Sequence, residues 1–216
     1  VSYRRHPAPG VDELAGRGVF YGSAVTEAVG CTGQDVYIVG GANSAGQAAM
    51  YLSKWAKSVT IVVRAESLEA SMSYYLVQQI EKNPVISVRP CTEVTAAHGD
   101  GHLEQITLRD KVSGDEETVD TGYLFLFIGA APRTEWLDGV VVRDRHGFVV
   151  SGQDLTIDGA RPPGWSVDRA PHHLETSVPG IFAAGDVRAD SAKRVASAVG
   201  EGAMAVMLVH RYLAQP

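Results

Sequence analysis

The sequence predicts an α/β fold with a parallel sheet, on three observations. A short apolar run rich in β-branched and aromatic side chains, residues 36–39, stops abruptly at Gly40 and Gly41. Helix-forming residues follow from 44 to about 57, and a second apolar run occupies residues 59–63. Strand, helix and strand in this order form the repeating unit of a parallel sheet.

The loop between the first strand and its helix has the spacing of a dinucleotide-binding fingerprint. Glycine permits a tight turn, small side chains let backbone approach a pyrophosphate, and the helix directs free N–H groups at that anion. The fingerprint is weakened, because alanine replaces its usual middle glycine. An ordinary turn between strand and helix is the alternative, which the second strand disfavours. The candidate nucleotide-binding residues of this Rossmann-like domain are Gly40, Gly41, Ala42, Asn43, Ser44 and Ala45.

The end of the second strand decides between the two nicotinamide nucleotides. A carboxylate at this place accepts from the 2′-hydroxyl of NAD, whereas an arginine pairs with the extra phosphate of NADP. Arg64 therefore indicates NADPH, while Glu66 keeps NADH open. A solvated arginine at a strand end is an equally good interpretation of Arg64 taken alone.

The other segments up to residue 128 predict a domain completed by a three-stranded antiparallel meander, whose strands are separated by glycine-containing turns. Residues 16–22 are typical of a loop that enters this domain, and residues 1–15 of an edge strand and a hinge. The expected elements are helices over 23–30 and 67–81 and strands over 85–88, 91–97, 102–110, 117–121 and 123–128.

From Gly129 onward the composition shifts to turns and short strands. Residues 151–173 predict a long exposed loop with little regular structure, in which we interpret Trp165 as an anchor. The adjacent histidines His172 and His173 lack the spacing of a metal motif, so we expect them at the surface.

A second informative stretch, TSVPGIFAAGDV, covers residues 176–187. A buried strand is expected over 181–184, leading to Gly185 and Asp186, and a helix of small residues over 193–210. The helix N-terminus offers unpaired N–H groups and a positive dipole end. The carboxylate of Asp186 could accept from a polyol hydroxyl or could merely cap the helix.

Composition excludes several classes of function. The chain has 216 residues, 45% of them hydrophobic, and a net charge of −6, so it offers no basic patch for nucleic acid or for an acidic membrane surface. No apolar run approaches the length of a membrane span. The two cysteines, Cys31 and Cys91, form neither a disulfide framework nor a metal site. We expect a cytoplasmic protein without a metal ion; because the chain starts at Val1, it is interpreted as a fragment.

Taken together, these motifs resemble the latter two thirds of a thioredoxin-reductase-like flavoprotein of the pyridine nucleotide-disulfide oxidoreductase class. TSVPGIFAAGDV is the most specific of them; GRGVFYG, VGGANSAG and GAAPRT resemble the domain entry, the NADPH loop and the return hinge. The resemblance implies that Asp186 bonds the ribitol of FAD, that the N–H groups of Val195 and Ala196 face the flavin beside Arg194, and that the protein is a homodimer. The remaining residues expected at the cofactors are Gly129 and Gly185.

Two departures from this family concern its chemistry. Thioredoxin reductases carry CxxC at the positions held here by Gly22 and Val25, so the chain has no catalytic thiol pair to pass electrons to a protein disulfide. Cys31 and Cys91 are interpreted as structural thiols. The basic HRR cluster of the family is reduced to Arg64, which weakens the case for NADPH.

A further departure is that the chain has only one glycine-rich fingerprint, whereas such enzymes carry another that grips the ADP of FAD. We expect residues 1–15 to be a remnant of the FAD domain and a hinge, 16–128 the NAD(P)H-binding domain, and 129–216 the C-terminal part of a second, FAD-binding Rossmann-like domain. The resemblance implies rotation about hinges near 10–16 and 128–132. Similar sequence motifs occur in reductase modules that follow a cyclic-nucleotide-binding domain. The resemblance therefore implies such a domain as an upstream partner.

The expected activity is hydride transfer from NADPH, or NADH, to FAD, with an unknown electron acceptor and small-molecule dinucleotides as the other partners. One alternative is a sensing module that binds NAD(P)H without turnover, which the lost cysteines favour and the flavin motif disfavours. Another is an enzyme of the ferredoxin-NADP reductase type, which would also lack CxxC.

Overall fold

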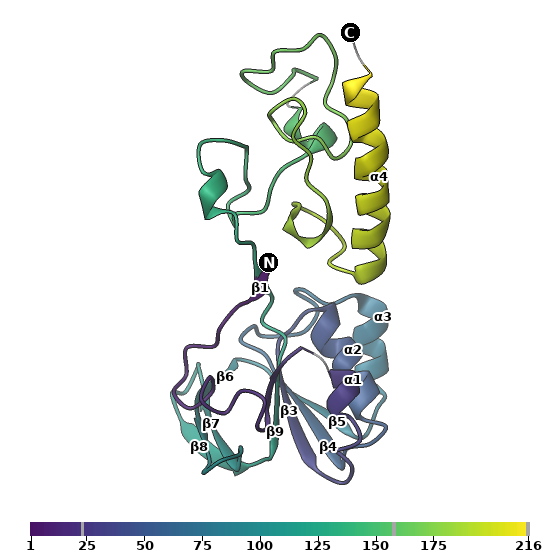
Figure 1. Ribbon diagram of the computed structural model, residues 1–216. Coiled ribbons are helices and arrows are strands. Elements are labelled where there is room, and N and C mark those ends of the chain that lie inside the picture. The colour runs from purple at the N-terminus through teal and green to yellow at the C-terminus, as the bar shows by residue number, and fades with distance from the viewer. Residues whose placement is uncertain (23, 157–158, 215–216) are drawn as a thin grey trace. The chain divides into compact units, whose positions relative to one another are not determined.

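A parallel sheet organises the first part of the chain, as the alternation of strands and helices predicts (Figure 1). The computed structural model describes residues 1–22, 24–156 and 159–214, with the backbone alone at residues 24 and 25. The chain divides into two compact units, one of Arg4–Gly129 and one of Val1–Tyr3 with Ala130–Pro216.

The sheet has five strands in the order β2-β9-β3-β4-β5, all parallel. Residues 16–22 were expected to be a loop, and this expectation is wrong, because three of them form the edge strand β2, in which Val19 is buried and pairs with Leu124. The strands are β2 Val19–Tyr21, β3 Asp35–Val39, β4 Ser58–Val62, β5 Ile86–Arg89 and β9 Tyr123–Leu126.

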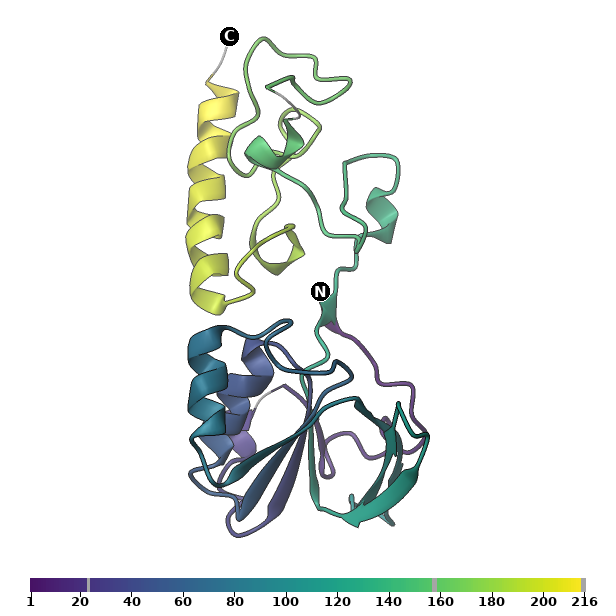
Figure 2. The same ribbon diagram turned by 180° about the vertical axis from the view of Figure 1, so that it is seen from behind.

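Three helices cover one face of this sheet: α1 Ala24–Glu27, α2 Asn43–Leu52 and α3 Tyr74–Glu81 (Figures 1 and 2). The predicted helices over 44–57 and 67–81 are too long. Residues 64–73 instead form an irregular segment, because Leu68 and Met72 are buried against the helices and Ser71 and Ser73 bond to the glycine-rich loop.

The predicted meander is confirmed and covers the opposite face of the sheet (Figure 2). Its strands are β6 Thr92–His98, β7 Gln105–Asp110 and β8 Glu116–Asp120. The apolar layer beneath it includes Val11 and Leu14. Residues 4–15 therefore pack within the unit Arg4–Gly129, which differs from the domain boundary expected after residue 15.

The other unit contains little regular structure besides one long helix, α4 Val195–Leu213. The short strand β1 Ser2–Tyr3 pairs antiparallel with β10 Ala130–Ala131, which confirms an edge strand at the start of the chain. The buried strand predicted over 181–184 is wrong: Phe182 forms a single bridge with Glu175, and Ile181 is 40% exposed.

The segment 151–173 is less exposed than predicted. It contains a 3₁₀ turn, η2 Gly152–Leu155, and Leu155 is buried. Trp165 donates from its indole Nε1 to the carbonyl of Arg169 at 2.6 Å, which confirms it as a loop anchor. His173 is exposed, as predicted, whereas His172 is half-buried. Residues 157 and 158 of this predicted loop lie outside the described residues.

Candidate functional site

The glycine-rich loop lies at the carboxyl end of β3, where α2 begins. Gly40 has φ +145°, and a Cβ there would lie 2.7 Å from the carbonyl oxygen of Phe127, so only glycine fits without a backbone shift. The amides of Gly41, Ala42, Asn43 and Ser44 donate no hydrogen bond within the described chain, whereas the amide of Ala45 donates to Ala42 at 3.0 Å. Four amides therefore remain available to an anion.

Two hydrogen bonds fix the shape of this loop. The Ser71 hydroxyl donates to the carbonyl oxygen of Gly41 at 2.9 Å, and the amide of Ser73 donates to Oδ1 of Asn43 at 2.8 Å. The Asn43 side-chain oxygen is thus already used by the protein, while its backbone N–H and its side-chain Nδ2 stay open as donors to a ligand.

Arg64 follows β4 at the same edge of the sheet, because β3 and β4 are parallel neighbours. Its side chain is exposed and makes no hydrogen bond or ion pair within the described chain. The charge of Arg64 does reach His6, whose pKa is lowered first by burial and then by this guanidinium. A cation at the end of β4 that makes no hydrogen bond or ion pair of its own suits a ligand phosphate.

Asp186 lies in the short 3₁₀ turn η3 Gly185–Val187. Its half-buried carboxylate makes no hydrogen bond or ion pair within the part of the chain that the structure describes. The ammonium of Lys193 donates instead to the carbonyl of Arg188 at 2.9 Å and to the Ser191 hydroxyl at 2.7 Å. An unpaired carboxylate of this kind can accept a hydrogen bond from a ligand hydroxyl.

The helix α4 begins at Val195, with Arg194 as its N-cap residue. Arg194 provides no side-chain cap, and the first helical amide bonded to it is that of Ala198, at 3.0 Å. The amides of Val195 and Ala196 therefore have no partner within the described residues. Asp186 is not the N-cap residue of this helix, so its alternative role as a cap is wrong.

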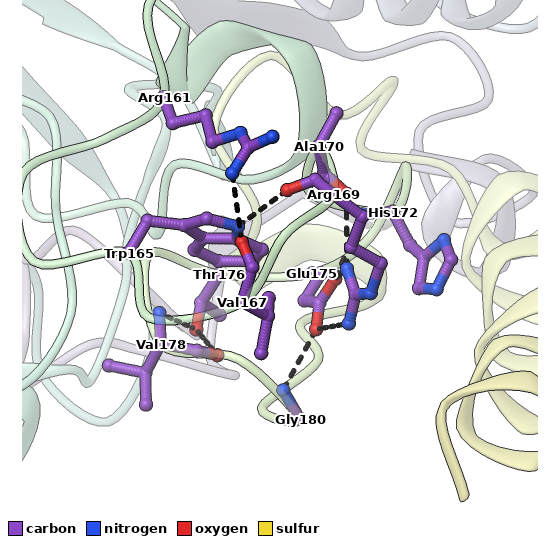
Figure 3. Close-up of polar contacts among 10 residues, drawn as sticks. All are labelled: Arg161, Trp165, Val167, Arg169, Ala170, His172, Glu175, Thr176, Val178 and Gly180. Carbon is purple, nitrogen blue, oxygen red and sulfur yellow. Dashed lines mark hydrogen bonds and ion pairs between the residues drawn. The ribbon is translucent and has the colours of Figure 1, made fainter. Parts of the chain in front are cut away.

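A buried carboxylate that the sequence prediction missed anchors the segment leading to Asp186 (Figure 3). Glu175 accepts hydrogen bonds from both terminal nitrogens of Arg169, at 2.6 and 2.8 Å, and from the amides of His172 and Gly180, at 2.9 and 2.8 Å. Burial would raise the pKa of Glu175, but these bonds outweigh it and hold the pKa below its usual range. In the sequence Glu175 stands directly before the stretch 176–187, and nothing in the local pattern indicates this role.

Gly22 and Val25, the two positions at which the family resemblance places CxxC, hold no thiol. Gly22 is buried with φ +72°, and its amide donates to the carbonyl of Leu126; the Val25 side chain lies outside the described residues. Both cysteines are free, and burial raises the pKa of Cys31 to about 11. Such a thiol is a poor nucleophile at neutral pH.

Over the described residues, no group of His, Cys, Asp or Glu side chains is arranged to hold a metal ion. No helix among those residues is long and apolar enough to cross a membrane.

A profile of the pyridine nucleotide-disulphide oxidoreductases matches residues 2–202. The chain belongs to this family. Among curated members, the thioredoxin reductase of Streptomyces clavuligerus is 33% identical over 212 residues, covering 98% of this chain and 59% of that protein. The thioredoxin reductase of Bacillus subtilis is 30% identical over 213 residues, covering 99% and 61%.

Solved structures of the family share this fold. The thioredoxin reductase of Lactococcus lactis matches with a TM-score of 0.76 at 26% identity, covering 97% of this chain and 62% of that one. The enzyme from T. acidophilum matches with a TM-score of 0.74 at 27% identity and the same coverage. The chain thus spans about 60% of the length of the curated family members it matches.

The residues predicted from sequence fall into two groups, one in each unit. The loop over 40–45, Arg64 and Gly129 belong to the unit Arg4–Gly129, where Gly129 is the last residue and accepts from the amide of Arg4 at 3.1 Å. Gly185, Asp186 and the start of α4 belong to the other unit.

Proposed function

We propose that the chain binds NAD(P)H in the unit Arg4–Gly129 and contributes the C-terminal part of an FAD site from residues 130–214. The whole protein would then be an FAD-dependent NAD(P)H oxidoreductase. Two features of one unit support this proposal, in a chain of this family: the carboxylate of Asp186 makes no hydrogen bond within the described chain, and the first amides of α4 are free as well.

The glycine-rich loop suits the nucleotide pyrophosphate. The free amides of residues 41–44 can donate to its oxygens, and the positive end of the α2 dipole adds to the attraction. Arg64 would pair with the 2′-phosphate of NADPH, while Glu66 leaves NADH as a second reductant. Gly129 would act as a pivot between the units.

The residues around Asp186 suit FAD. Asp186 can accept from a ribityl hydroxyl, and the amides of Val195 and Ala196, beside Arg194, can donate to a flavin oxygen that gains negative charge on reduction. FAD, when bound, takes up a hydride from reduced nicotinamide and passes the electrons on. The protein's part is to bind, orient and exclude water.

The electron acceptor is proposed to be something other than a disulfide relayed through the protein's own thiols. Gly22 and Val25 replace the cysteine pair, and the high pKa of Cys31 makes it no substitute. A homodimer, a cytoplasmic location and an upstream cyclic-nucleotide-binding domain remain predictions of the family resemblance.

Purification of the full-length protein tests this proposal. A yellow product that NADPH bleaches anaerobically, with an unchanged count of free thiols before and after reduction, is the expected result. New thiols on reduction would show a redox-active disulfide and refute that part. Colourless protein that still binds nucleotide would refute the flavoenzyme.

The lost cysteine pair also favours a second candidate, a sensor that binds NAD(P)H without turnover. A pure sensor has no need of the Asp186 turn, so flavin content separates the two. A ferredoxin-NADP reductase-like enzyme is distinguished by NADPH-dependent reduction of a ferredoxin.

A further inference from the structure

The carboxylate of Glu201, on α4, bonds to residues on both sides of Asp186 in the chain. Oε2 of Glu201 accepts from the amide of Gly185, the residue before Asp186, at 2.6 Å. The guanidinium of Arg188, two residues after Asp186, donates to Oε1 of Glu201 at 2.7 Å and to Oε2 at 3.3 Å. The two charged side chains are only 11% and 14% exposed. Glu201 thus bridges the turn and the helix.

The backbone of the turn is shaped for this contact. Gly185 has φ +78°, and a Cβ there would lie 3.3 Å from the Cβ of Ala198 on α4, so the turn packs directly on the helix. The hydrogen bond from Arg188 holds the pKa of Glu201 below its usual range, so the carboxylate stays charged at neutral pH. The Asp186 side chain makes no hydrogen bond or ion pair among the described residues, although its charge reaches Lys193, so the bonds of its chain neighbours fix its backbone.

We infer that Glu201 is a positioning residue for the flavin-site carboxylate: it holds Gly185 and Arg188 against α4 and thereby sets where Asp186 presents its oxygens to the ribityl chain. This inference rests on the proposed function. It goes beyond it by assigning a role to an ion pair that does not touch the cofactor.

A purely stabilising ion pair is the competing explanation, and the two make different predictions. A positioning residue acts through Asp186, so its removal has little effect on FAD once Asp186 is gone. A stabilising pair weakens FAD binding independently, so the two changes add.

The experiment measures the FAD dissociation constant of full-length apoprotein for wild type, Glu201→Ala, Asp186→Ala and the double variant. Glu201→Ala and Asp186→Ala should each raise the constant about tenfold or more. The double variant should stay within about twofold of Asp186→Ala. Glu201→Gln keeps an acceptor for the Gly185 amide but loses the charge facing Arg188, so it should restore part of the affinity. Asp138→Ala, which removes the carboxylate that pairs with Arg143 in the same unit, is the matched control and should leave FAD binding unchanged.

Hydrogen exchange of the apoprotein gives a readout without cofactor, since the Gly185 amide should exchange faster in Glu201→Ala than in wild type. Unchanged FAD affinity in Glu201→Ala, or additive losses in the double variant, would overturn the inference while leaving the proposed function intact. If Asp186→Ala binds FAD as wild type does, or wild type binds none, the proposed flavin site is wrong and the inference falls with it.

Discussion

At the residue scale, Arg64 is expected to decide which nicotinamide nucleotide is preferred. Its guanidinium is exposed and has no hydrogen-bond partner within the described chain, so all of its pairing capacity is open to a phosphate. Arg64→Ala should weaken NADPH binding by about 1.5 to 3 kcal/mol, which raises its Kd roughly 10- to 100-fold. The Kd of NADH should change by less than about twofold. Titration of both nucleotides measures the two constants.

Lys57→Ala is the control for Arg64, because Lys57 is an exposed cation at the opposite end of β4, where it pairs with Asp35 at 2.9 Å. It should change neither constant. If Arg64→Ala leaves the ratio of the NADPH and NADH constants unaltered, Arg64 has no part in the site.

Glu175 is expected to be the largest single contributor to the stability of its unit. Its side chain is fully buried and four hydrogen bonds depend on it, so Glu175→Ala removes the carboxylate that pairs with the mostly buried guanidinium of Arg169. The expected loss is about 3 to 5 kcal/mol in the free energy of unfolding, measured with urea. Asp168→Ala breaks an exposed pair with Arg161 in the same loop and should cost under about 1 kcal/mol. Equal losses in the two variants would contradict this assignment.

Acid should destabilise the unit that contains Glu175, because it protonates the carboxylates of Glu175 and Glu201. The pKa values of Glu175 and Glu201 are lower in the folded protein than their ordinary value of 4.5. Their contribution is therefore complete above about pH 4.5 and is lost as the pH falls through the folded pKa values. Glu175→Gln, which carries no charge at any pH, should be less stable near neutrality but should show a shallower fall in its urea midpoint below about pH 4.5. An identical slope in wild type and variant would remove Glu175 from the acid response.

Single residues of the candidate site were predictable where the local pattern itself carries the chemistry. Gly40 and Asp186 stand at the ends of recognisable motifs, so their places followed from the sequence. Glu201 lies within an ordinary helical pattern, and its partners Gly185 and Arg188 are found only once the chain has folded. No sequence signal could have connected them.

At the element scale, the turn between β3 and α2 is expected to tolerate glycine at position 42 but not alanine at position 40. A Cβ on Gly40 would meet the Phe127 carbonyl, a backbone atom that cannot rotate away, so Gly40→Ala should cost about 1 to 3 kcal/mol and weaken NADPH binding. Ala42→Gly, at an exposed residue with an ordinary φ of −96°, should stay within about 1 kcal/mol. Urea unfolding and NADPH titration measure both variants, and comparable losses would contradict the role given to Gly40.

Elements were predicted well where local pattern and long-range pairing agree. The strands β3 and β4 were placed within one residue, because apolar runs end at sharp polar or glycine boundaries. The edge strand β2 was missed, since its three residues lie between turn-forming glycines and become a strand only by pairing with β9, far along the chain. The opposite error concerns residues 181–184, where a strand was predicted and none forms. Their pattern is apolar, but no strand among the described residues pairs with them.

At the scale of the whole molecule, the two units differ in how completely their apolar surfaces are covered. In the unit Arg4–Gly129 both faces of the sheet are buried, one by the helices and one by the meander. In the other unit, Leu208 is the only residue of α4 that is buried, while Val195 is 82% and Leu213 is 72% exposed. We therefore expect these 216 residues alone to bind the nicotinamide nucleotide more completely than they bind the flavin.

The 216-residue chain expressed alone is accordingly expected to bind NADPH but to retain well under one FAD per chain. Asp186 and the start of α4 can contact only part of the FAD molecule. Binding costs the cofactor its translational and rotational freedom, and a few contacts do not offset this loss, so the cofactor dissociates readily. Flavin absorbance against protein absorbance after gel filtration measures retention, and NADPH titration of the same sample provides the control for folding. Stoichiometric flavin in this chain would show that residues 1–216 hold the whole FAD site, and the assignment of only its C-terminal part to them would be wrong.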